Sequence, residues 1–358
     1  MKKLTKKRIV FLILCACLVL ASAACFLAEG RLTRLLSSQQ AAERWQGEGE
    51  QSFTQLSCYL AVDEPIHLNE IYAFRYAILD QLHGAGFEAD TDTRLFRDAW
   101  CTTGKVKVAS ELGHGEASAI AVGGNFFDFH PIRLLNGTYL AESDLMKDRV
   151  LLDEDLAWLL FGGTDLQGMP MEINGVPFVV GGVVQREQDF ASRRAYTAGM
   201  GLYMSYDAYV LLNEDAGATC YELVLAEPVR GFAFSFVKEK FPIGQGVIVE
   251  NSGRFSFGRV LSLIGDFGTR SMQNQGVIFP YWENAARAVE DWCAMLLLLG
   301  LLFAVFPVVV AVVWLIRLLK RGKEKLGDEV LPKAKDRIGE AIRKKQRKHW
   351  EKKHPGET

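Results

Sequence analysis

Side chains of the types that bind metals gather at one place in this sequence. In the segment ELGHGE, Glu111, His114 and Glu116 lie close together, and imidazole and carboxylate groups are ligands for zinc. Their spacing matches no ligand pair on one face of a helix, and the interleaved Gly113 and Gly115 are typical of a solvated turn. We therefore expect no metal site and no cofactor.

Other patterns that carry chemistry are weak as well. The glycine-rich stretch GGNFFDF does not open an amphipathic helix after a strand, as a dinucleotide-binding loop does, and no GxSxG nucleophile elbow occurs. The acidic run at 153–155 precedes LAWLLF, where negative charge caps a helix and suits its dipole. The sequence predicts a non-enzymatic protein without catalytic residues, and a membrane-tethered hydrolase is the least supported alternative.

The seven cysteines divide between two environments. Four lie in or beside long apolar runs, where a thiol packs as a small apolar group. The other three, Cys58, Cys101 and Cys220, lie in the central part of the chain and cannot all pair with one another. Buried free thiols are the expectation, and one disulfide among these three is the alternative.

Charge is segregated along the 358 residues, although 41 basic and 43 acidic residues give a net charge of only −2. The first eight residues carry five Lys or Arg and no acid, and residues 317–358 carry 15 basic and 7 acidic residues. The remainder is strongly acidic. A near-neutral total argues against a nucleic-acid-binding protein, and 49% hydrophobic residues exclude a disordered chain.

Two uncharged runs are long enough to cross a bilayer as helices. Residues 9–28 form a run of twenty and residues 292–316 a run of 25, and at about 1.5 Å per residue each spans a hydrocarbon core of ~30 Å. Pro307 in the second run is tolerated in a membrane helix. The ends of the runs carry residues typical of the membrane interface, namely Arg8, Trp292, Trp314 and Arg317.

The first run has other interpretations. Ser22, Ala23 and Ala24 could form the cleavage site of a signal peptide, and Cys25 could be the lipidated residue of a lipoprotein. Ser22, however, stands where a lipoprotein signal has an aliphatic residue. Because the run is long for a signal peptide and continues into a helical pattern, we expect an uncleaved anchor.

Basic residues flank the outer sequence side of both runs, which predicts that both termini are cytoplasmic and that residues 29–291 are extracytoplasmic. The tail is expected to attract anionic headgroups through clustered Lys and Arg residues, and docking to a cytoplasmic partner is left open. Its basic cluster consists of Lys344, Lys345, Arg347, Lys348, Lys352 and Lys353.

Helical spacing continues outside both membrane runs. Apolar residues recur at steps of three and four from Leu32 to Trp45 and from Tyr281 to Trp292. We expect two stalk helices that cover each other's apolar stripe, the first of them ending at Gly47. Chance spacing of apolar residues is the alternative.

The block between the stalk helices alternates strand and helix patterns, which predicts an α+β fold in two lobes. Its clearest signal is MEINGVPFVVGGVV, where Asn174-Gly175 between apolar runs indicates a hairpin because both turn residues need positive φ. Strands are expected at 52–61, 220–227 and within GVIVEN, and helices over 68–82, 231–241 and near 255–264.

Three consecutive stretches of this block resemble the periplasmic core domain of MacB-like ABC-transporter permeases (MacB/FtsX-type). They are GGNFFDFHPIRLLNGTYL, RVLLDEDLAWLLFGG and LQGMPMEINGVPFVVGGVV. Counted from the first residue of the first stretch to the last residue of the third, they span 62 residues. Because the matching residues are glycines expected at turns and aromatics expected in the core, they indicate architecture rather than chemistry. They are Asn125, Phe126, Phe127, Gly137, Phe161, Gly162, Gly168, Asn174, Gly175 and Val179 to Val184.

The resemblance implies a reduced member of that family. Its permeases have four membrane segments and an ATPase partner or domain, whereas this sequence has one segment after the external block and no GxxxxGK[ST] phosphate loop. The implied function is an accessory or divergent permease subunit of an ABC-type assembly. ABC ATPase and permease subunits, a second copy in a homodimer and the lipid bilayer are the partners considered. A stand-alone extracytoplasmic binding or sensing module is the alternative.

The expected organisation has seven parts. A cytoplasmic N-terminus is followed by a membrane helix, a stalk helix with its linker, the MacB-like core domain, a second stalk helix, a second membrane helix and a basic cytoplasmic tail. Their boundaries are 1–8, 9–28, 29–51, 52–278, 279–291, 292–316 and 317–358.

Overall fold

The computed structural model describes residues 6–87, 95–196, 199–266, 273–274, 276–325 and 337–347. Expectations for residues 1–5 and for the last part of the basic tail, including Lys348, Lys352 and Lys353, lie outside these ranges. The chain forms two compact units. One comprises residues 1–27 and 298–358, and the other comprises residues 28–297.

Two helices are long and apolar enough to cross a membrane. They are α1 (Lys6–Arg34) and α10 (Tyr281–Lys325), and α10 contains Pro307. In the first unit the two pack closely: Ser22 Oγ donates to the Gly300 carbonyl at 2.9 Å, and the Phe11 and Phe306 rings lie 5.9 Å apart. A hydroxyl bonded to a backbone carbonyl is satisfied without water, as a membrane interior requires. The prediction of two candidate membrane helices is confirmed.

The first stalk helix is not continuous, contrary to the prediction. Helix α1 ends at Arg34, a single 3-10 turn η1 covers Ser37–Gln39, and a short α2 covers Ala41–Gln46. The side chain of Gln55 replaces the lost helical hydrogen bonds, because its Nε2 donates to the Ser38 carbonyl at 2.7 Å and its Oε1 accepts from the Ala41 amide at 2.8 Å. A side chain from a distant strand therefore overrides the local helical pattern.

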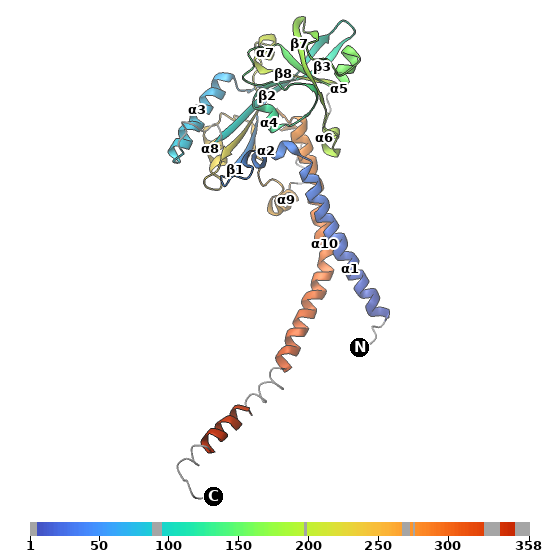
Figure 1. The fold of residues 1–358 in the computed structure, drawn as a ribbon, viewed down its shortest axis with the longest axis vertical. Helices are drawn as coiled ribbons and strands as arrows, with labels where there is room; N and C mark the ends of the chain where they lie inside the picture. The colour runs from blue at the N-terminus through green and yellow to red at the C-terminus, as the bar shows by residue number, and fades with distance from the viewer. Residues whose placement is uncertain are drawn as a thin grey trace. The chain divides into compact units, whose positions relative to one another are not determined.

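One mixed sheet runs through the second unit. Its order is β10-β1-β9-β2-β3-β8-β5-β7-β4, and β6 pairs with β2 and β7 (Figure 1). The predicted α+β fold is confirmed. The long central pair β2 and β3 joins a first lobe, which contains β10, β1 and β9, to a second lobe, which contains β8, β5, β7, β4 and β6. The strands are β1 (Phe53–Tyr59), β2 (Phe96–Ala109), β3 (His114–Gly124), β4 (Arg133–Gly137), β5 (Arg149–Asp153), β6 (Pro170–Ile173), β7 (Val176–Gln185), β8 (Gly201–Ser205), β9 (Cys220–Ala226) and β10 (Val247–Glu250).

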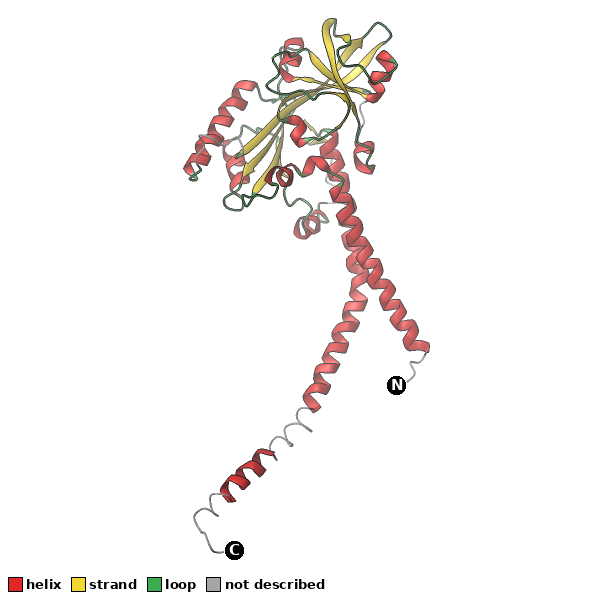
Figure 2. Ribbon diagram, viewed as in Figure 1, coloured by secondary structure: helices red, strands yellow, loops and turns green. Residues whose placement is uncertain are grey.

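Helices cover both faces of this sheet, as Figure 2 shows. Helices α3, α5, α7 and α8 bury their apolar residues in a core on one face, and α2, α4 and the first turn of α10 do so on the other. A short ladder of β11 (Gln273–Asn274) and β12 (Val277–Ile278) precedes α10. The remaining helices are α3 (Leu68–Gly84), α4 (Phe126–Phe129), α5 (Glu154–Phe161), α6 (Phe190–Ala195), α7 (Tyr206–Leu212), α8 (Phe232–Lys240) and α9 (Phe257–Leu263).

The predicted hairpin is present. Strands β6 and β7 pair from Pro170↔Val179 to Ile173↔Val176, and the turn residues Asn174 and Gly175 have φ of 51° and 81°. The Asn174 side chain also accepts from the Lys107 amide at 2.9 Å, which ties the turn to β2. Predicted helices α3, α8 and α9 and strands β1, β9 and β10 are confirmed within a few residues of their expected ends.

Replacing Gly137 tests a close approach between the backbones of strands β4 and β7. Gly137 has φ of +89°, and an added Cβ would lie 2.2 Å from the Gly181 carbonyl oxygen. The left-handed conformation costs an L-residue about 1–2 kcal/mol, and the clash adds to this. We expect Gly137→Ala in the full-length chain to lower Tm in mild detergent by roughly 5 °C or more.

The matched control is Gly163→Ala, since an added Cβ there meets nothing within 4 Å and the backbone is not left-handed. Its Tm should stay close to that of the parent chain. Equal losses in the two variants would show that the approach at Gly137 is unimportant.

Candidate functional site

The base of the domain holds a buried ionic junction around Arg254, in the turn before α9. The Arg254 guanidinium donates to both oxygens of Glu283 at 2.7 and 2.8 Å and to both oxygens of Glu290 at 2.6 and 3.2 Å. It also donates to Gln39 Oε1 in η1 at 3.0 Å. The exposed fractions of Arg254, Glu283 and Glu290 are 5%, 0% and 6%. One guanidinium thus joins the turn before α9, Glu283 and Glu290 of α10, and the segment after α1.

A second guanidinium belongs to the junction. Arg287, one turn further along α10, donates to Glu283 Oε1 at 2.8 Å, so two guanidinium groups face two carboxylates. Burial by itself raises the pKa of the Glu283 carboxyl, but Arg254 and Arg287 outweigh burial and hold that pKa below its ordinary value. Burial likewise lowers the pKa of the Arg254 guanidinium, and the two glutamates reverse this and raise it. Arg254 and Glu283 are therefore ionised at neutral pH.

A second buried network adjoins the junction. His130 Nδ1 lies 3.0 Å from Ser38 Oγ, and its Nε2 contacts a carboxylate oxygen of Glu222. Ser57 Oγ donates to the other Glu222 oxygen at 2.8 Å and accepts from Asn251 Nδ2 at 2.7 Å. Serine, histidine and glutamate in contact have the composition of a hydrolase triad. All three are buried here, so the arrangement holds β1, β9, α4 and η1 together without offering a nucleophile to solvent.

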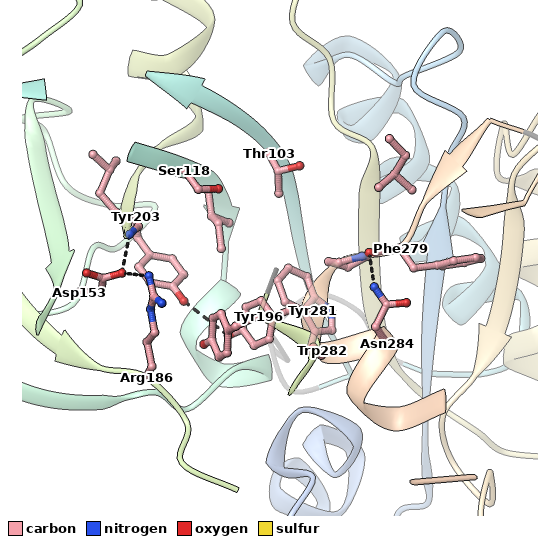
Figure 3. A pocket seen from close by; sticks show the side chains of 16 residues that line it. Thr103, Ser118, Asp153, Arg186, Tyr196, Tyr203, Phe279, Tyr281, Trp282 and Asn284 are labelled. Carbon is pink, nitrogen blue, oxygen red and sulfur yellow. Dashed lines mark hydrogen bonds and ion pairs between the residues drawn. The ribbon is translucent and has the colours of Figure 1, made fainter. Parts of the chain in front are cut away.

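An aromatic pocket of about 220 Å³ lies between the sheet and the start of α10 (Figure 3). The rings of Tyr196 and Tyr281 stack with centroids 4.0 Å apart, and the hydroxyls of Tyr203 and Tyr281 lie 3.5 Å apart. Tyr281 also donates to Glu187 at 3.0 Å. One set of phenol groups therefore brings together strand β8, the segment after α6 and the first turn of α10.

The polar side of the pocket is an ion pair. The Arg186 guanidinium contacts the Asp153 carboxylate and lies over the Tyr196 ring, 5.1 Å from its centroid. Burial raises the pKa of the Asp153 carboxyl, and Arg186 together with the Leu156 and Gly201 amides opposes the rise. Burial also raises the pKa of the Tyr196, Tyr203 and Tyr281 phenols, which stay neutral donors at physiological pH. The pocket therefore combines neutral phenol groups with one ion pair.

The first part of the family motif lies beside these sites. Asn125 accepts from Arg97 Nη1 at 2.9 Å and donates to the Asp98 carbonyl at 3.2 Å, which positions α4. The Phe126 ring packs at 5.7 Å from Trp282 of α10, and the Phe127 ring packs at 5.9 Å from Tyr203. These two aromatics therefore line the contact between the sheet and α10.

The other motif residues shape turns of the second lobe. Gly162 ends α5 in the left-handed conformation with φ of 73°, directly after Phe161. Gly168 has φ of 87°, and its amide donates to the Val180 carbonyl at 2.8 Å. These glycines, together with Gly137 and the turn at 174–175, set the course of the backbone. They belong neither to the ionic junction nor to the aromatic pocket.

The predicted interface anchors divide between the two units. Trp292 is partly exposed, and its ring contacts Phe190 of α6 with centroids 5.9 Å apart. Arg8 in α1 and Trp314 and Arg317 in α10 are exposed, and their position at a membrane surface stays a prediction.

The three central cysteines are buried free thiols, as expected. Cys101 and Cys220 face each other across the β2–β9 pair, whereas Cys58 of β1 belongs to the core on the opposite face of the sheet. In the segment ELGHGE, Glu111 lies in the turn after β2, whereas His114 and Glu116 belong to the first residues of β3 and pair with Ala109 and Lys107. No cluster of three metal-ligating side chains occurs among the residues whose placement is described.

Comparison with known proteins finds similarity at the level of structure. No protein-family model and no curated protein matches the chain. The extracellular domain of the noncanonic ABC-type transporter YknZ from Gram-positive bacteria is 12% identical, with a TM-score of 0.36, over 53% of this chain and 92% of that one.

Two further solved structures are of the same kind. The periplasmic region of MacB from Actinobacillus actinomycetemcomitans is 16% identical, with a TM-score of 0.37, over 55% of this chain and 89% of its own. A domain of a putative permease from Porphyromonas gingivalis is 14% identical, with a TM-score of 0.34, over 55% and 88%. This part of the chain is thus similar in structure to the external domains of MacB-like permeases.

Replacing Arg254 tests the junction. Arg254→Met leaves Glu283 and Glu290 buried with Arg287 as the remaining cation close to Glu283. Breaking a buried ion pair from one side costs about 3–5 kcal/mol. We expect Tm of the full-length chain in mild detergent to fall by roughly 10 °C. Arg259→Met is the control, because that guanidinium is half exposed and pairs with Glu250 near the surface. It should change Tm little.

The pH dependence has a defined sign. In the parent chain the pKa of Glu283 is depressed, so its stabilising contribution is present above the ordinary value of about 4.5 and is lost as pH falls through the folded value. In Arg254→Met the burial that remains should raise that pKa, so the variant should gain stability as pH falls from 8 towards 5. Parallel Tm-against-pH curves for the two chains would contradict this account of the junction.

Proposed function

We propose that this chain is a non-enzymatic, two-pass membrane subunit of an ABC-type assembly, in which the external domain moves as one body with the helices that carry it. The observation that carries the proposal is the ionic junction at Arg254. It fixes the base of α10 and the segment after α1 to the same point of the domain.

A rigid attachment is what transmission of movement requires. Ala285, Ala286 and Val289 of α10 are buried in one cluster with Leu36, and Leu32 of α1 packs against it. Close packing of small residues leaves little room for the helices to slide independently. Any rotation of these helix bases would therefore turn the sheet with them. A binding module on a passive tether would function without such a connection.

The ABC-type assignment comes from the ordered motifs between Asn125 and Val184, which resemble MacB-like permeases. The chain contains no phosphate-binding loop of the P-loop type, so the proposal assigns nucleotide hydrolysis to a separate subunit. The basic tail, described over residues 337–347 as a helix, is the segment proposed to reach cytoplasmic partners.

Co-purification tests the assembly. The full-length chain, tagged and extracted from its native membrane in mild detergent, should bring down an ABC ATPase and a permease subunit, identified by mass spectrometry. A two-pass membrane protein of another class with the same tag is the control for non-specific capture. Recovery of the chain without either subunit would overturn the proposal.

The orientation is proposed from the charge flanks, with residues 29–291 outside the cytoplasm and both termini inside. In a chain whose seven cysteines are replaced, a cysteine at Ser37 should react with an impermeant maleimide in intact cells, and a cysteine at Gly356 should react only after permeabilisation. Labelling of position 356 from outside would reverse the model of the topology.

A stand-alone sensing module is the second candidate, and the aromatic pocket favours it. Phenol groups, an ion pair and apolar walls around about 220 Å³ are features of small-molecule sites, although the volume is below the usual range. For this candidate, the co-purification experiment should recover a kinase or a transcriptional regulator in place of an ATPase.

A further inference from the structure

Two short helices at the base of the domain expose large apolar side chains. Phe190 of α6 is 37% exposed, and Phe257 and Leu261 of α9 are 56% and 45% exposed. Figure 1 shows both helices on the side of the sheet from which α10 leaves it. We call this surface the collar, and we define it as α6, α9 and Trp292.

The collar is attached directly to α10 at the start of its uncharged run. Ala191 and Ala195 of α6 and Val260 of α9 are buried in one cluster with Val289 and Cys293 of α10. The Phe190 ring contacts the Trp292 ring at 5.9 Å. Tryptophan at the end of an apolar run lies at the level of lipid headgroups. Contact with Trp292 therefore sets α6 at the same level.

The exposed apolar groups share faces that the domain does not cover. Phe257 and Leu261 are one turn apart on α9 and so lie on the same face, while Val260 beside them is fully buried. Isolated exposed apolar residues are ordinary on a protein surface, but here three of them and Trp292 surround one helix base. Water is a poor environment for this grouping, and the acyl–headgroup boundary is a good one.

The charges of the collar match an anionic lipid surface. Arg193 and Arg194 in the last turn of α6 are exposed, and the Arg194 guanidinium lies 4.0 Å from the centroid of the Phe190 ring. The acidic neighbour Asp189 is engaged in capping, since it accepts from the Ala191 and Ser192 amides at 3.0 Å. Aromatic and aliphatic groups next to arginine are typical of segments that lie in the membrane interface.

We propose that the collar inserts its apolar side chains into the outer surface of the bilayer around α10 and binds anionic lipid headgroups through Arg193 and Arg194. The occupant of the collar is lipid, rather than a second copy of the chain. The domain would then rest on the membrane as well as on its two helices. The proposal depends on membrane insertion of α10 and is independent of any ABC partner.

Photo-crosslinking of the full-length chain tests this contact. The photoreactive residue p-benzoylphenylalanine is introduced at Phe257, Leu261 or Phe190, and each chain is reconstituted in vesicles of phosphatidylcholine and phosphatidylglycerol at about 3:1. Leu112, 76% exposed in the turn between β2 and β3, is the matched control position. We expect lipid adducts, measured by mass spectrometry, at a yield about tenfold higher at the three collar positions than at Leu112.

The same experiment also tests whether the collar prefers anionic lipid. Phosphatidylglycerol should be enriched among the adducts at Phe257 by about twofold or more over its share of the vesicle. Arg193→Gln with Arg194→Gln should abolish this enrichment, whereas Arg230→Gln with Lys238→Gln, both exposed elsewhere on the domain, should preserve it. An unchanged Tm in each variant shows that the fold is retained.

Three results would overturn the proposal. They are equal adduct yields at Phe257 and Leu112, crosslinks between two copies of the chain in place of lipid adducts, and enrichment that survives removal of both arginines. The first two exclude lipid as the occupant of the collar, and the third excludes the arginines as the headgroup site. None of these results depends on an ATPase or permease, so the proposed function is tested separately.

Discussion

The buried charge of Arg254 constrains the whole base of the domain. Removing a guanidinium from water costs several kcal/mol unless carboxylates replace the lost hydration. Glu283 and Glu290 stand two turns apart on α10, so both reach Arg254 only when that face of the helix points into the domain. The ion set therefore fixes the rotation and the height of α10, and the close packing of Ala285 and Ala286 holds the helix in the same position.

Much of the secondary structure could be predicted because it depends on local patterns of residues in the sequence. Asn174-Gly175 specifies its hairpin through positive φ alone, and the apolar spacing of α3 specifies its buried face. The break after Arg34 could not be predicted, because it depends on the amide of Gln55, whose position is known only once the sheet is formed. Helices of six residues or fewer, such as α4 and α6, are too short to show a period.

The candidate sites were harder to predict than the fold. Arg254, Glu283 and Glu290 look like ordinary surface charges, since charged residues are exposed by default. The tyrosines of the pocket come from segments that only the topology brings together. One signal was available: Glu222 is the single charge in the otherwise apolar strand CYELVLA, and a carboxylate there implies a buried polar partner, which is His130.

The shared pair β2 and β3 has a mechanical consequence. Its ladder is continuous from Ala99↔Gly124 to Ala109↔His114, about 35 Å of backbone that passes from one lobe into the other. Two lobes joined by one continuous ladder share its backbone and belong to one compact unit, so they are not separate domains. A tilt of about 10° at one end of a ladder of this length displaces the other end by roughly 6 Å, so a small rotation of the β2 and β3 pair would become a large displacement at the β2–β3 turn.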